Sequence, residues 1–257
     1  ENDDITHVSG KVDPIADFEV VETELMLADM ESLEKRKAGV VKKANSGDKE
    51  AKAQVALIDL ALVELNAGRP ARRAVISKDD TRAWNMLQLL TSKPVLFVAN
   101  VDEDSAATGN EYSKRVEARA AEEGAACVVI SAQIEAELAL LDEPDRSEYL
   151  ETLGLEEPGL TRLIHTGYNL LDLQTYFTVG PKEARAWTIR KGWSAPKAAG
   201  VIHGDFEKGF IRAETVAYKD YVEYGGEAGA KEAGKMRSEG KEYIVQDGDV
   251  MLFRFNV

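Results

Sequence analysis

The sequence predicts an α/β protein in which a parallel sheet carries an inserted helical hairpin and is followed by a separate, mostly β domain. Two apolar stretches, Pro94–Ala99 and Ala126–Ile130, flank a helical segment from about Tyr112 to Glu123. That order is typical of a parallel strand–helix–strand crossover. Two long stretches with helical periodicity precede the crossover, and short strand-like segments follow it from Leu173 onward.

The first of these regions predicts two helices. From Val20 onward apolar residues recur at helical spacing, at Val21, Leu25, Ala28, Leu33 and Val40, and then at Val55, Ile58, Leu62 and Leu65. Between them, Asn45 and Gly47 are suited to end one helix, while Ser46 or Asp48 can cap the next. We therefore expect an antiparallel hairpin that closes near Gly68–Pro70.

After the crossover the chain reads first as helices and then as strands. Helical segments are expected at about Ile134–Leu141, Asp145–Leu153 and Gly159–Asn169. The predicted strands are Gln174–Val179, Glu183–Thr188, Phe210–Val216 and Asp249–Val257. This change of character predicts a C-terminal β domain of roughly 85 residues.

Charge is distributed unevenly along the chain. The net charge of −14 argues against a uniformly basic nucleic-acid-binding surface. The segment from Lys35 to Lys52, however, contains seven cationic residues and only two anionic ones. This basic segment is either a solvated helix end or a contact for RNA phosphates, and aromatic residues for base stacking are absent from it. Its candidate contact residues are Lys35, Arg36, Lys42, Lys43 and Lys49.

Several classes of protein are excluded or disfavoured. No apolar run approaches the roughly 18 residues of a membrane helix, so a membrane protein is excluded. The single cysteine, Cys127, cannot form an internal disulfide, and no secretory signal opens the sequence, so we expect a cytoplasmic protein. Cys127 is expected to be a small buried side chain. The histidines His7, His165 and His203 are too scattered to predict a metal site.

The residues that point to chemistry follow the two crossover strands. Asn100–Glu103 ends the first strand, and Ser131 with Ala132 ends the second. The carboxyl ends of parallel strands form one edge of a sheet, where ligands usually bind. Two strands cannot make a covered sheet, and the first residue is Glu1, so we expect partner strands from a preceding region and a chain entered midway.

The same motif indicates which purine base is preferred. GTPases carry Asn-Lys-x-Asp at this position, and the aspartate accepts two hydrogen bonds from guanine. Here Val101 stands in place of the lysine and Glu103 in place of the aspartate. Adenine has an acceptor where guanine has a donor, so a carboxylate fixed there would be repelled. The motif therefore favours adenine, and a GTPase is the weaker alternative.

One string imitates a phosphate-binding loop. Gly229–Met236 has the spacing Gly-x-x-x-x-Gly-Lys, but Met236 stands where a hydroxyl would hold magnesium. Its Ala, Lys and Glu residues favour an exposed short helix instead. We do not assign phosphate binding to it.

Longer strings give the chain a resemblance to the YchF family of Obg-related P-loop NTPases over its whole length. They are Ile5–Pro14, Glu22–Leu25, Asn100–Glu103, Leu153–Leu160, Leu173–Thr178, Ala186–Thr188, Asp205–Ala213 and Asp247–Val250.

The resemblance implies a fold with three parts. They are a partial nucleotide-binding (G) domain at residues 1–19 and 94–171, an inserted coiled-coil hairpin at 20–93, and a TGS domain of the β-grasp type at 172–257. It also implies ATP in preference to GTP, Mg²⁺ as cofactor, and the ribosome, its large subunit and RNA as partners. A monomer or weak dimer is expected.

The resemblance also assigns roles at the strand ends. Asn100 and the backbone of Val101 would contact adenine, Glu103 would occupy the altered specificity position, and Ser131 with Ala132 would lie under the base. The family's phosphate-binding loop and magnesium-binding loops have no counterpart in this sequence. We therefore expect no catalytic residue and no metal ligand among these 257 residues. The alternative reading is a non-catalytic module that binds ribosomes or RNA.

Overall fold

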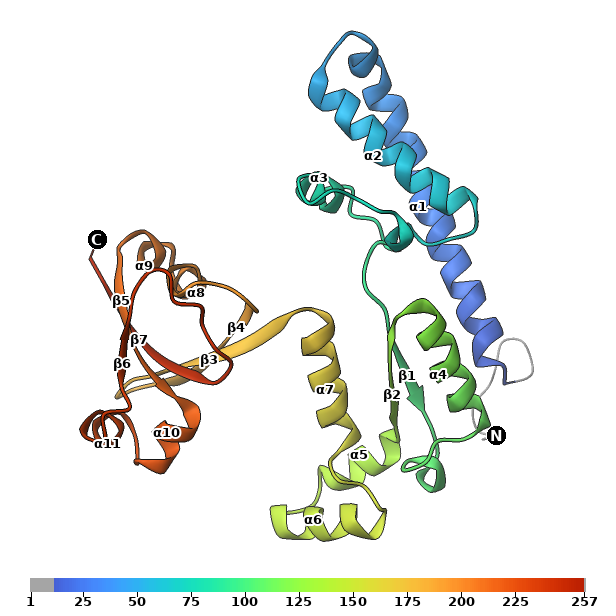
Figure 1. Ribbon diagram of the computed structural model, residues 1–257. Helices are drawn as coiled ribbons and strands as arrows, with labels where there is room; N and C mark the ends of the chain where they lie inside the picture. The colour runs from blue at the N-terminus through green and yellow to red at the C-terminus, as the bar shows by residue number, and fades with distance from the viewer. Residues whose placement is uncertain (1–11, 257) are drawn as a thin grey trace. The chain divides into compact units, whose positions relative to one another are not determined.

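The computed structural model describes residues 12–256, which fall into two compact units with the division between Leu163 and Ile164 (Figure 1). The string Ile5–Pro14 lies mostly outside the described residues. Each unit is described by itself.

Helices α1 (Pro14–Asn45) and α2 (Lys49–Asn66) form a long antiparallel pair (Figure 1). α1 begins earlier than the periodicity from Val20 predicts, because Asp13 caps it and Pro14 occupies its first turn. Of the two candidate caps for α2, the side chain of Asp48 is the one used, since its Oδ1 accepts from Ala51 N at 2.9 Å.

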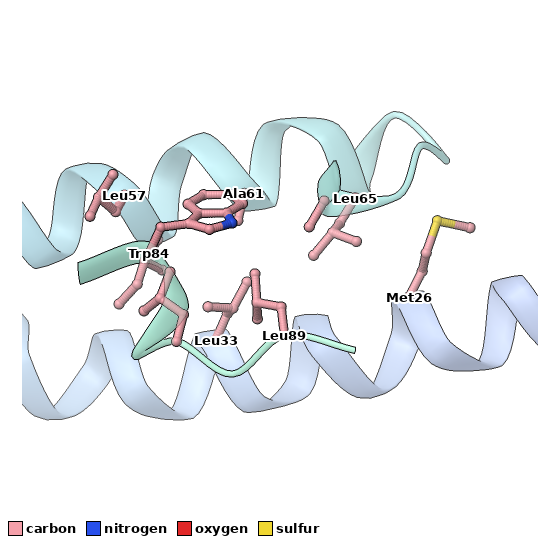
Figure 2. Packing of buried hydrophobic residues seen from close by; sticks show 10 residues of the cluster. Met26, Leu33, Leu57, Ala61, Leu65, Trp84 and Leu89 are labelled. Atoms are coloured by element: carbon pink, nitrogen blue, oxygen red, sulfur yellow. The ribbon is translucent and has the colours of Figure 1, made fainter. Parts of the chain in front are cut away.

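The core of this pair is completed by the segment that follows it. Leu33 and Ile58, which are fully buried, pack with Leu65 between the helices. Residues 67–95 fold back with a 3-10 turn η1 (Ala71–Arg73) and a short helix α3 (Thr81–Asn85). Figure 2 shows Trp84 and Leu89 of this segment lying between α1 and α2. The periodicity of the sequence does not predict this contribution.

A buried carboxylate fixes the returning segment to α1. Asp29 is 3% exposed and accepts from Leu90 N and Thr91 N, both at 2.8 Å, and from Thr91 Oγ1 at 2.7 Å. Three donors offset the cost of burying one carboxylate. The end of the returning segment, just before the first strand, is therefore fixed against the hairpin.

The predicted crossover is confirmed as β1 (Leu96–Asn100), α4 (Glu111–Glu123) and β2 (Ala126–Ile130). β1 and β2 are parallel, with Asn100 paired to Ile130. α4 begins with a capping box and ends at Gly124, whose φ of 66° favours glycine.

The expectation that Cys127 is a buried side chain was wrong. Val98 in the middle of β1 is 44% exposed, and Cys127 in β2 is only partly buried. The described part of this sheet has two strands, so few neighbouring side chains cover its faces.

Three helices follow β2, as predicted: α5 (Ala132–Leu138), α6 (Glu143–Thr152) and α7 (Gly159–Leu170). The start of α7 is held against the end of β2. Gly159 N donates to Glu135 Oε1 at 2.7 Å, and a Cβ on Gly159 would lie 2.9 Å from a methyl carbon of Ile130. Glycine is therefore needed there by close packing.

The second unit contains a five-stranded mixed sheet in the order β4-β3-β7-β5-β6. β3 pairs antiparallel with β4 and parallel with β7, while β5 pairs antiparallel with β7 and β6. The strands are β3 (Leu173–Val179), β4 (Ala184–Arg190), β5 (Phe210–Ala217), β6 (Arg237–Glu239) and β7 (Asp249–Phe255). The sequence predicted four of them and missed the three-residue β6.

Besides the end of α7, the described part of this unit has four helices: α8 (Ala195–Ile202), α9 (Gly204–Lys208), α10 (Tyr218–Glu223) and α11 (Glu227–Glu232). α8 packs on the sheet, where the buried Tyr176 hydroxyl donates to Ala198 O at 3.0 Å. α11 covers the first half of Gly229–Met236, so this string is the predicted short helix and not a phosphate-binding loop.

Candidate functional site

The ends of β1 and β2 form one edge, and two hydrogen bonds join them there. Val101 N donates to Ile130 O at 2.8 Å, which extends the strand pairing by one residue. Beyond it, Ala132 N donates to the side-chain Oδ1 of Asn100 at 2.9 Å. The structure therefore brings together four of the five residues that the sequence singled out, namely Asn100, Val101, Ser131 and Ala132.

The amide of Asn100 keeps one end available. Its Oδ1 is engaged by Ala132, and its Nδ2 has no partner among residues 12–256. The residue is exposed, so Nδ2 can donate a hydrogen bond to a ligand at this edge. A purine ring presents such an acceptor at N7.

Asp102 and Glu103 have different environments although they are adjacent. Asp102 Oδ1 accepts from Ser105 N at 3.0 Å and so caps the 3-10 turn η2 (Glu103–Ser105). Glu103 is partly buried, and its Oε1 is a buried oxygen without a hydrogen-bond partner in the described chain. Glu103, which stands where the GTPase pattern has an aspartate, thus has one carboxylate oxygen buried inside the protein.

Ser131 carries a second unpartnered oxygen. The residue is 3% exposed, and its Oγ makes no hydrogen bond to any described residue. Buried polar atoms without partners are uncommon and cost about 1–3 kcal/mol each. Two such atoms, on Glu103 and Ser131, follow the ends of β1 and β2.

A tyrosine that sequence reasoning missed lies near Glu103. The hydroxyl of Tyr149 on α6 donates to the carboxylate of Glu137 on α5. That hydrogen bond, together with the negative charges of Glu137 and Glu103, raises the pKa of Tyr149 to about 12. No short motif contains Tyr149, so only the packing of α5 and α6 places it here.

The basic segment surrounds the turn between α1 and α2. Lys42, Lys43 and Lys49 are exposed, and their side chains have no ion-pair partner in the part of the chain that the structure describes. Lys35 is likewise exposed, whereas Arg36 donates to Met86 O at 3.0 Å. The lysines at the turn are therefore the available cations, while Arg36 is already engaged.

Residues 12–256 contain neither a metal-binding cluster nor a membrane-spanning helix. No group of three or more His, Cys, Asp or Glu side chains there could hold a metal ion. Within the same range, no helix is long and apolar enough to span a membrane.

Comparison with known sequences identifies relatives over the whole chain. Residues 173–256 match the family model YchF-GTPase_C, described as a protein of unknown function. The chain is 53% identical over 257 residues to the ribosome-binding ATPase YchF of Haemophilus ducreyi and to that of Escherichia coli O157:H7. It is 52% identical over 258 residues to the protein of the same name from Bacillus subtilis. Each match covers 100% of this chain and 70% of the relative.

Solved structures give a consistent result. The YchF GTPase of Schizosaccharomyces pombe matches with a TM-score of 0.82 and 36% identity, over 98% of this chain and 69% of that one. A GTP binding protein from Pyrococcus horikoshii matches with a TM-score of 0.57 and 20% identity, over 95% of this chain and 72% of that one. The second likeness concerns the fold alone.

Proposed function

Because this chain belongs to the YchF family, we propose that the protein is a P-loop NTPase that binds and hydrolyses ATP in preference to GTP and binds ribosomes. The observation that carries the nucleotide part is the hydrogen bond between Asn100 and Ala132. It holds the two strand ends together and leaves the Asn100 Nδ2 as a donor toward a purine base.

The geometry of Glu103 supports adenine over guanine. Recognition of guanine needs a carboxylate that faces the base and accepts two hydrogen bonds. One oxygen of Glu103 is buried instead, and Val101 contributes backbone groups but no cation. In the proposed complex Asn100 and the Val101 backbone contact adenine, with Ser131 and Ala132 beneath the ring.

The domain organisation that we propose is a partial nucleotide-binding domain at 1–19 and 94–171, a coiled-coil hairpin at 20–93, and a TGS domain of the β-grasp type at 172–257. The mixed sheet supports the last assignment, because β3 and β7 lie side by side and parallel while their outer neighbours are antiparallel. The division at Leu163 lies inside α7, close to the proposed boundary.

ATP hydrolysis also needs groups that grip the phosphates and Mg²⁺. The string Gly229–Met236 does not supply them, since its first half is α11. We propose that these groups belong to the part of the relatives that this chain does not match. The 257 residues alone are then expected to bind ATP weakly and not to hydrolyse it.

ATP turnover tests this proposal directly. The assay compares the 257-residue chain with a protein extended at its N-terminus by the corresponding region of a YchF relative. We expect Mg²⁺-dependent turnover only in the extended protein. Equal turnover in both proteins would contradict the proposal.

For ribosome binding we propose the lysines at the turn between α1 and α2 as a contact for RNA phosphates. Lys42, Lys43 and Lys49 are exposed and unpaired within the described residues, on a chain whose net charge is −14. The same observation favours the second candidate function, a ribosome- or RNA-binding module that needs no catalysis. We further propose that the protein is cytoplasmic. We also propose that it is a monomer or weak dimer, and sedimentation of the purified chain tests this oligomeric state.

A further inference from the structure

One arginine links the base of the hairpin to the helix that packs against β1 and β2. Arg72 lies in η1, and its guanidinium donates to Glu22 of α1 and, at 2.6 Å, to Glu123 of α4. The three side chains are largely buried, with 17%, 12% and 6% of their surfaces exposed. One cation therefore pairs with two carboxylates that come from different helices.

The backbone of Arg72 is fixed to the hairpin. Arg72 N donates to Thr91 O at 3.0 Å, and Ala71 N donates to Thr91 Oγ1 at 3.0 Å. Thr91 in turn donates to the buried carboxylate of Asp29 on α1. Arg72 is therefore held in place by hydrogen bonds to the hairpin, whereas Glu123 lies on α4.

On the other side, contacts continue from Glu123 to the strand that ends at the candidate site. Arg119 donates to Glu123 at 3.0 Å, and its guanidinium lies 5.6 Å from the ring centre of Phe18 on α1. The ring of Phe18 lies 4.9 Å from that of Phe97 on β1. We call the cluster of Glu22, Arg72, Arg119 and Glu123 the joint. Phe97 precedes Asn100 on the same strand, so the joint contacts, through Phe18, the strand that carries the motif.

The joint is open on one side. A cavity of about 460 Å³ lies beside it and is lined almost entirely by charged side chains. They include Glu22, Glu64, Arg69, Arg73, Arg119 and Glu122. Close apolar packing resists displacement on all sides, whereas a cavity lined by polar groups leaves room for side chains to move.

We propose that Arg72 sets the angle between the hairpin and α4, and that the hairpin swings about this joint when the Arg72 ion pairs are broken. The consequence for function rests on the proposed function, because the angle then determines where the lysines at the turn lie relative to the strand ends. The mechanical statement itself does not depend on nucleotide or ribosome binding.

The physical reason for this role is that Arg72 lies between two carboxylates, those of Glu22 and Glu123. Removing the guanidinium leaves Glu22 without its ion-pair partner and Glu123 with Arg119 alone, in a partly buried place, which is destabilising. The attraction that holds α1 to α4 through Arg72 is then lost, and the unpaired charge of Glu22 favours a more hydrated position away from α4. A lysine at position 72 restores the charge but not the planar fork that contacts two carboxylates, so it is expected to hold the angle only in part.

Pulsed electron paramagnetic resonance tests the proposal in the full 257-residue chain. Spin labels are attached at Ser46→Cys in the turn and Ala118→Cys on α4, both exposed positions, in a Cys127→Ala background. We expect Arg72→Ala to widen the distance distribution at least twofold and Arg72→Lys to give an intermediate width. The matched control is Arg73→Ala, which removes a neighbouring exposed arginine and is expected to leave the width unchanged.

An unchanged distribution in Arg72→Ala, or equal widening in Arg73→Ala, would overturn the proposal. If Arg72→Ala does not fold by circular dichroism, the triple variant Arg72→Gln/Glu22→Gln/Glu123→Gln carries the test, because it removes the ionic link together with both of its carboxylates. A triple variant as narrow as the parent would then overturn it. The measurement is made without nucleotide, so a failure of ATP binding leaves its result interpretable.

Discussion

Asn100 and Ala132 are 32 residues apart in the chain and are joined by a 2.9 Å hydrogen bond from the Ala132 N–H to the Asn100 Oδ1. This bond connects the last residue of β1 to the first residue of α5, just after β2. It also orients the Asn100 amide, so that the Nδ2 is the end left for a ligand.

Substitutions at Asn100 separate these two roles. In the extended protein Asn100→Asp keeps an oxygen for Ala132 but loses the donor, and Asn100→Ala loses both. We expect ATP affinity to fall about tenfold in Asn100→Asp, equivalent to about 1.4 kcal/mol, and further in Asn100→Ala. Isothermal titration calorimetry measures both values. Asn66→Ala, at an exposed end of α2, is the control, and an affinity that is unchanged in Asn100→Asp would contradict the donor role.

Trp84 should contribute as much to hairpin stability as the helical core residues. It is 6% exposed in the same cluster as Leu33. We expect Trp84→Ala to lower the free energy of unfolding by about 3–5 kcal/mol and Leu33→Ala by about 2–5 kcal/mol. Urea unfolding followed by circular dichroism measures both changes. Val75→Ala, at a position that is 91% exposed, should change stability by less than about 0.5 kcal/mol. A similarly small effect of Trp84→Ala would show that residues 67–95 do not complete the core.

Charge reversal at the turn tests the proposed ribosome contact. We expect Lys42→Glu/Lys43→Glu to reduce co-sedimentation with ribosomes at least tenfold, because phosphate contacts depend on cations. The charge-matched control is Lys219→Glu/Lys231→Glu on α10 and α11, both exposed. If the two double variants bind alike, the lysines at the turn are only a solvated helix end.

The cap of α1 should make stability depend on pH. The Ala16 N–H, together with the charge of Arg115, lowers the pKa of Asp13 below 3.8. The charged form is therefore favoured in the folded state, and its contribution is present above about pH 4 and lost as pH falls through the folded pKa. Asp13→Asn keeps a capping oxygen but cannot titrate. We expect the stability difference between parent and variant to shrink between pH 5 and 2 in thermal unfolding, and a constant difference would contradict this role.

The crossover was predictable because apolar strands and a capped helix leave clear signals in sequence. β1, α4 and β2 follow directly from them, and the parallel pairing then fixes which residues share the candidate edge. The core contribution of Trp84 was not predictable, because residues 67–95 have no regular periodicity and pack only through tertiary contacts. The same holds for the three-residue strand β6.

At the candidate site, the motif Asn100–Glu103 could be recognised in the sequence, but the burial and hydrogen bonding of each side chain could not be predicted from it. Asp102 caps a turn and Glu103 has a buried oxygen, although both are acidic neighbours. Tyr149 comes from α6 and is brought near Glu103 only by helix packing. Arg72 reads as an ordinary loop arginine until Glu22 and Glu123 are placed on either side of it.

Base preference of the extended protein tests the account most directly. ATP and GTP affinities are measured by competition in the parent and in Val101→Lys/Glu103→Asp, which restores the guanine-binding pattern. The account predicts that the parent prefers ATP and that the double variant shifts the ratio toward GTP by at least tenfold. A parent that prefers GTP, or a ratio that the double variant leaves unchanged, would contradict it.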